Sequence, residues 1–202
     1  MTKGYTMRFF KENSYDIVRL YINQIGISIF SMVLYTAVGT IELSSTLLDI
    51  GLSVFLMGFY FALIYTASWE YGAKDKIRID AGKMDSSSSK GAKLALLAGV
   101  PNYLLAGLCL VFGLIYRATL SSGVGIVAVL FNTFMRLSMA MYLGIIQTMF
   151  GSFTGAADDA FVFHAAGFLV AHVLAVAVIS LGYFLGSKDK RIFAAIFTRN
   201  KK

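Results

Sequence analysis

Long uncharged apolar runs alternate along the chain with short polar segments. Four runs reach or exceed the roughly 18 residues that a helix needs to cross a bilayer. They cover about residues 17–41, 50–69, 94–116 and 160–186. The pattern therefore predicts an all-α fold, a polytopic integral membrane helical bundle that forms a single transmembrane domain over residues 1–202.

A fifth apolar stretch, within residues 117–159, is interrupted by polar side chains. At about 100° per residue, Asn132, Thr133, Arg136 and Gln147 fall within one arc of roughly 100° of a helix, which is an amphipathic pattern. The segment is either an outward-facing cap that lies on the bundle or is partly sunk in it, or two short halves that dip into the membrane and return, or a single crossing inside the bundle that would place the tail outside. A crossing would bury Arg136 at a cost of about 2.5–3.5 kcal/mol, while no Gly or Pro marks a turn near this arginine.

The positive charges give the expected topology. Of the 18 Lys and Arg residues, all but Arg117 and Arg136 lie in the first 19 residues, the loop 70–93 or the tail 187–202. Because Lys and Arg of short loops collect on the cytoplasmic side, we expect both termini and this loop to face the cytoplasm. The membrane is expected to be the plasma membrane. That arrangement requires an even number of crossings between the loop and the tail.

Composition narrows the function classes. The chain is 57% hydrophobic and 14% charged, against about 25% charged residues in a typical soluble domain. The formal net charge of +7 flanks the predicted spans, which indicates contact with anionic lipid headgroups rather than nucleic acid. The basic start carries no cleavage site, so we expect an uncleaved first span. Asn23 and Gln24, near the start of that span, are expected to reach headgroups or water.

No pattern of catalytic or metal-binding residues is visible. Cys109 is the single cysteine, and the two histidines, His164 and His172, lie eight residues apart in the last span without an H-E-x-x-H pair. We therefore expect no metal, no cofactor and no enzyme activity. His164 either forms a hydrogen bond inside the bundle or responds to protons.

Two stretches offer candidate ligand or partner contacts. Trp69, Lys74, Lys76 and Arg78 either dock a cytoplasmic partner or a phosphate-bearing ligand, or form an interfacial aromatic belt followed by a solvated loop. Their spacing does not match a phosphate-binding or dinucleotide-binding loop.

Asn132 and Arg136 form the second candidate contact. On the outer face they would bind an anionic headgroup or substrate. Inside the bundle, Arg136 would need an acidic partner. The candidates are Glu42, Asp49 and the Asp158–Asp159 pair.

Two further features concern packing. Pro101 in the third span predicts a kink, and a full break there would free backbone carbonyls for a ligand. A stripe of small residues in the last span predicts a helix-packing seam, with a homodimer contact as the alternative. The stripe contains Gly167, Ala171, Ala175, Gly182 and Gly186.

These features predict a non-enzymatic membrane protein that acts as an accessory or transport-type component of a membrane assembly. The alternative is a small autonomous channel or carrier with a polar pathway through Pro101, Arg136 and His164. No internal repeat supports an inverted-repeat transporter.

Overall fold

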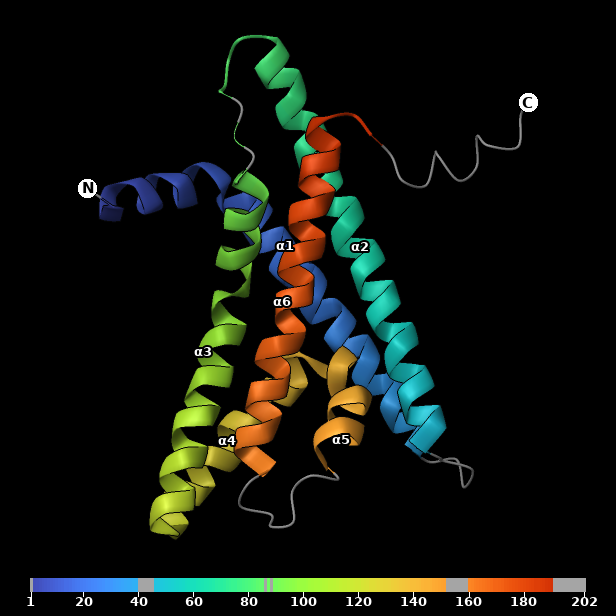
Figure 1. Ribbon diagram of the computed structural model, residues 1–202, viewed down its shortest axis with the longest axis vertical. Helices are drawn as coiled ribbons and strands as arrows, with labels where there is room; N and C mark the ends of the chain where they lie inside the picture. The colour runs from blue at the N-terminus through green and yellow to red at the C-terminus, as the bar shows by residue number, and fades with distance from the viewer. Residues whose placement is uncertain (1, 40–45, 86, 88, 152–159, 191–202) are drawn as a thin grey trace.

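Four long helices form the frame of the protein. The computed structural model describes residues 2–39, 46–85, 87, 89–151 and 160–190, and every regular element in these ranges is helical. Four helices are long and apolar enough to cross a membrane, and they lie together as a bundle (Figure 1). They are α1 (Thr2–Gly39), α2 (Thr46–Asp80), α3 (Lys90–Thr119) and α6 (Ala160–Ser187). The predicted membrane bundle is confirmed.

Burial follows the helical period. The buried apolar positions of α2 are three or four residues apart, as expected for one helix face. They are Leu56, Tyr60, Ile64, Ala67 and Tyr71. The outward faces are apolar as well, since Ile29 is 61% exposed and Val170 69% exposed. A bundle with an apolar outer surface is suited to lipid rather than water.

The helices extend past the predicted apolar runs at the charged end of the bundle, which carries the start of α1 and the 81–89 loop. The α2 helix continues beyond Trp69 to Asp80, through a stretch that contains the good helix formers Ala73, Lys74, Lys76 and Arg78. Gly72 interrupts that stretch, but a Cβ there would clash with the backbone of Tyr183 and Ser187, so close packing on α6 requires this glycine. The last turns of α2 project beyond the ends of α3 and α6 (Figure 1).

The stripe of small residues in α6 is a packing seam within the chain. A Cβ on Gly182 would meet the side chain of Ser68, and one on Gly186 would meet the backbone of Trp69. Gly167 packs in the same way on Phe150. The helices α2 and α6 therefore approach each other as closely as their backbones allow. A homodimer contact through this stripe stays a prediction.

Polar contacts join the four long helices at the charged end. Arg19 of α1 pairs with Glu70 of α2 at 3.6 Å. Lys90, at the start of α3, pairs with Asp75 at 2.6 Å, and the Tyr183 hydroxyl of α6 donates to the same carboxylate at 2.8 Å. The start of the first span, the middle loop and the end of the last span therefore share one side, as the charge pattern predicts.

Residues 122–151 form a broken helical pair that enters the bundle and returns. The pair consists of α4 (Ser122–Ser138), a 3₁₀ turn η1 (Ala140–Tyr142) and α5 (Leu143–Gly151), with an 87° bend. The start of α4 and the end of α5 both lie at the end of the bundle opposite the charged end (Figure 1).

This arrangement agrees with the second predicted placement of the segment. Met139, Ala140 and Met141 are fully buried, so the segment is sunk in the bundle and does not lie on its surface. A single crossing is wrong because Phe161, at the start of α6, packs on Gly113 near the end of α3, so the chain returns to the side it left.

Candidate functional site

The break between α4 and α5 lies in the middle of the bundle, where a backbone group cannot turn to water. The carbonyl of Ser138 accepts a hydrogen bond from Ser28 Oγ at 2.6 Å and one from Gln24 Nε2 at 3.3 Å. Both donors belong to α1 and are buried. The expectation that Gln24 reaches headgroups is therefore wrong, because its amide satisfies the end of a broken helix instead.

The start of α5 is capped from two other helices. The Gly144 amide donates to the Tyr35 hydroxyl at 3.0 Å, and the Ile145 amide donates to Ser53 Oγ at 3.2 Å. The Tyr35 and Ser53 hydroxyls also bond to each other. Side chains of α1 and α2 thus replace the intrahelical partners that the first amides of any helix lack.

The helix breaks without Gly or Pro. Ser138 Oγ bonds back to the Met135 carbonyl at 3.1 Å, a contact that competes with the helical ladder and bends helices. The partners on α1, which are Gln24, Ser28 and Tyr35, belong to a pattern that the sequence does contain. Together with Ser31, whose hydroxyl bonds to the Ile27 carbonyl of the same helix, they are spaced by four, three and four residues, which places them on one helix face. This polar stripe inside an apolar span was the signal that sequence reasoning missed.

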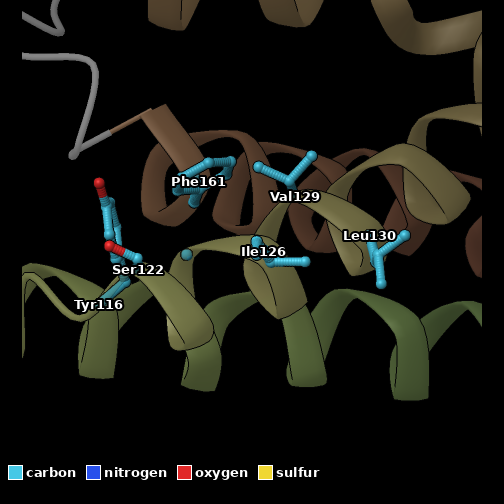
Figure 2. A pocket seen from close by; sticks show the side chains of 7 residues that line it. Tyr116, Ser122, Ile126, Val129, Leu130 and Phe161 are labelled. Atoms are coloured by element: carbon cyan, nitrogen blue, oxygen red, sulfur yellow. The ribbon is translucent and has the colours of Figure 1, made fainter.

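A hollow opens beside α4 at the opposite end of the bundle, between α3 and α6. It has a volume of about 480 Å³. Tyr116 and Ser122 lie at one end, Phe161 and Val129 lie side by side further along, and Leu130 lies at the far end (Figure 2). Because Ser122 begins α4, the Leu130 end of the hollow points toward the helix break.

The predicted residues Asn132, Arg136 and His164 lie beyond that end. Arg136 follows Val129 by seven residues on α4, which is almost the same direction around the helix. Arg136 is half-buried, and it lies near His164 across the α4–α6 contact. Within the described part of the chain, the Asn132 side-chain oxygen is buried without a hydrogen-bond partner. The structure thus gathers these three predicted residues along one face of α4 and the facing part of α6.

Among the described residues, no carboxylate pairs with Arg136. Of the proposed partners, Asp49 makes no ion pair with it, while Glu42, Asp158 and Asp159 lie outside the described ranges. The described lengths of α3, α4, α5 and α6 contain no Asp or Glu at all. The surroundings of Arg136 in these helices are therefore polar or apolar, but not acidic.

A second polar cluster lies at the centre of the bundle. Tyr103 and His172 meet edge-to-face at 5.0 Å, and Tyr60 meets Tyr142 in the same way at 6.2 Å. Among the described residues, Asn102, which is fully buried and precedes Tyr103 in the sequence, has no partner for either amide atom, and His172 Nδ1 and the Tyr142 hydroxyl also lack one. Buried polar groups normally find hydrogen bonds, so this cluster has the capacity to bind water or another polar ligand.

No family model, curated protein or solved structure matches this chain. Its function is therefore inferred from the arrangement of its own side chains.

The other predicted contact residues do not converge on one site. The Trp69 indole donates to the Lys190 carbonyl at 2.8 Å. Lys74 is exposed and lies 6.0 Å from the Tyr71 ring. Lys76 is half-buried, and Arg78 pairs with Asp75 at 3.8 Å. Because they point in different directions around α2, they form a charged helix surface rather than a pocket.

Pro101 neither breaks α3 nor joins the polar groups. The helix runs through it from Lys90 to Thr119, and Pro101 lines an apolar hollow against α1.

Within the described ranges, no three His, Cys, Asp or Glu side chains gather as metal ligands would. Of the predicted tail, residues 191–202 lie outside the described part of the chain.

Proposed function

We propose that this chain is a non-enzymatic, transport-type membrane protein, and that a small anion enters it through the hollow between α3, α4 and α6. The observation that carries the proposal is Arg136, a half-buried cation that lies less than two turns of α4 beyond the Leu130 end of this hollow and beside a helix break. Membership of a larger membrane assembly remains part of the proposal.

The charge of Arg136 favours an anion as the solute. An arginine in the membrane interior costs about 2.5–3.5 kcal/mol, and the described residues of the surrounding helices contain no carboxylate to offset it. A bound anion would offset that cost. The Asn132 amide and the His164 ring would add hydrogen bonds, because each has a nitrogen that can donate.

The broken helix favours transport over static binding. Discontinuous helices commonly form the solute sites of membrane transporters, where their ends contact the solute. Here the break is held by side-chain hydrogen bonds from Gln24, Ser28, Tyr35 and Ser53. Such bonds can exchange partners without unfolding a long helix, so a shift of α4 against α1 would alter access to Arg136.

Anion efflux from liposomes tests the proposal. Protein reconstituted into vesicles is expected to release chloride or phosphate faster than protein-free vesicles, and sodium no faster. Arg136→Gln is expected to slow anion release roughly tenfold, because a hydrogen bond to a charged group contributes about 1.5–3 kcal/mol. Arg117→Gln is the matched control, since Arg117 is exposed near the same end of the bundle.

Two results would contradict the proposal. The first is equal efflux from wild type, Arg136→Gln and empty vesicles. The second is that Asp158→Asn/Asp159→Asn impairs folding as much as Arg136→Gln does while wild type moves no anion. That combination would identify an internal counter-ion and a structural role for the arginine.

An accessory role is the second candidate, and one observation favours it. The last turns of α2 project beyond the bundle (Figure 1) and carry the exposed cations Lys74 and Arg78. We propose that this end faces the cytoplasm, by the distribution of positive charge, where it would dock an acidic partner. Loss of a co-purifying protein from a Lys74→Gln/Arg78→Gln variant, with anion flux unchanged, would support this role.

A further inference from the structure

An apolar groove runs along the outside of the bundle between α1 and α3. Its upper part, near the charged end, has a volume of about 320 Å³ and is lined by Ile17, Val18, Leu97 and Pro101 among others. Its lower part, about 490 Å³, continues between α1, α3 and α4. Tyr21 lines both parts, so the two hollows adjoin along α1.

The groove has the length of a lipid chain. Between Val18 and Val33 it follows α1 for roughly 22 Å at 1.5 Å per residue. One leaflet of the hydrocarbon core is about 15 Å deep. Each part also has a volume within the roughly 300–1,000 Å³ of small-molecule sites. The groove can therefore hold an acyl chain over the full depth of the leaflet at the charged end.

Two lysines flank the end of the groove where a headgroup would lie. Lys11 precedes Val18 by seven residues on α1, and Lys93 precedes Leu97 by four on α3, so each shares a helix face with a residue that lines the groove. Lys93 Nζ lies 5.9 Å from the centre of the Phe9 ring, which brings the two helix starts together. The nearby carboxylate of Glu12 is paired with Arg8 at 2.9 Å.

We propose that this groove binds one acyl chain of an anionic phospholipid whose phosphate lies beside Lys11 and Lys93. The apolar lining selects the chain, and the two ammonium groups select the charge of the headgroup. Lysine near an anionic membrane surface contributes favourable binding energy. The site differs from the Arg136 hollow, because α1 and α3 form most of its lining and no residue of α6 lines it, whereas the hollow is lined from α3, α4 and α6.

The proposal is tested by native mass spectrometry of the full chain with phosphatidylglycerol and phosphatidylcholine of matched chains. Wild type is expected to retain phosphatidylglycerol preferentially. Lys11→Gln/Lys93→Gln is expected to weaken the binding of phosphatidylglycerol roughly fivefold per lysine and to leave the binding of phosphatidylcholine unchanged. Lys74→Gln/Lys76→Gln removes the same charge from α2 and is expected to have no effect.

A groove-filling variant separates the chain site from general charge attraction. Val18→Trp replaces a side chain that is 48% exposed, so it fills the groove from the rim with little effect on the core. It is expected to reduce retention of both lipids. The proposal is overturned if wild type shows no preference for phosphatidylglycerol, or if Lys74→Gln/Lys76→Gln loses as much of this lipid as Lys11→Gln/Lys93→Gln does. It is also overturned if a second copy of the chain is retained instead of lipid.

Discussion

The buried ion pair at the charged end allows the most direct test of the fold. Asp75 is 3% exposed and Lys90 8% exposed, and their charged atoms lie 2.6 Å apart. Asp75→Asn removes the charge and keeps the shape, so Lys90 is left buried without its counter-ion. Breaking a buried pair in this way costs about 3–5 kcal/mol, and we expect Asp75→Asn to destabilise the protein by an amount in that range.

The other variants separate the pair from its surroundings. Lys90→Met is expected to cost less, because Asp75 keeps the Tyr183 hydroxyl at 2.8 Å and Arg78 at 3.8 Å. The double variant Asp75→Asn/Lys90→Met is expected to be more stable than the sum of the single changes by about 1–3 kcal/mol. Arg78→Gln is the control, and it should cost less than about 1 kcal/mol because Arg78 is 65% exposed.

Equilibrium unfolding in mixed detergent micelles with increasing dodecyl sulfate provides the measurement. Trp69 is the single tryptophan of the chain, and its indole donates to the carbonyl of Lys190, three residues after the end of α6. Its fluorescence therefore reports the contact between α2 and α6, and circular dichroism reports helix content. Additive single and double variants, within about 0.5 kcal/mol, would refute the reasoning, as would an Asp75→Asn protein as stable as Arg78→Gln.

Two further predictions concern packing and the helix break. Gly186→Ala is expected to destabilise the bundle by about 1–3 kcal/mol, since a Cβ there meets the Trp69 backbone. Gly58→Ala is the control and should be neutral or slightly stabilising, because a Cβ there meets nothing within 4 Å. The unfolding midpoint in dodecyl sulfate measures both effects. Ser28→Ala removes the shorter hydrogen bond to the break and is expected to cost about 0.5–1.5 kcal/mol, because Gln24 still donates to the Ser138 carbonyl, with faster amide hydrogen exchange in η1. Thr36→Ala is the control, because the Thr36 hydroxyl is exposed and bonds to the Met32 carbonyl of its own helix. Equal hydrogen exchange in the two variants would show that Ser28 does not hold the break.

Hydropathy and charge predicted the frame of the fold from the sequence. The four spans depend on local composition alone, and the shared side of their basic ends follows from where Lys and Arg lie. The ends of the helices were less predictable. The extension of α2 to Asp80 depends on Gly72 packing against Tyr183 of α6, and no local pattern reports a contact with a distant helix.

The site was predicted in part. Asn132, Arg136 and His164 share a face because helical spacing and an amphipathic pattern are local properties. The break at Ser138 was not predicted, because its cause lies in another helix. Ser28 lies 110 positions away in sequence, and a serine in an apolar span does not indicate which carbonyl it will meet. Asn102 illustrates the same limit, since its burial becomes visible only when the bundle is assembled.

The distribution of contacts indicates which part of the bundle can move. At the charged end, α2, α3 and α6 are joined by the Asp75 cluster, and the glycines of α6 hold α2 at backbone contact. These helices form a frame in which any displacement would expose a buried charge or separate a close-packed seam. The α4–α5 pair has a different attachment at its bend. Hydroxyl and amide side chains hold the backbone there, and each such bond contributes only about 0.5–1.5 kcal/mol. A shift of α4 is therefore the least costly rearrangement available near the bend. Such a shift would move Arg136 relative to His164. In the proposed mechanism the frame would keep the bundle intact while the broken pair changes access to the arginine, which is the division of roles that anion transport through this hollow would require.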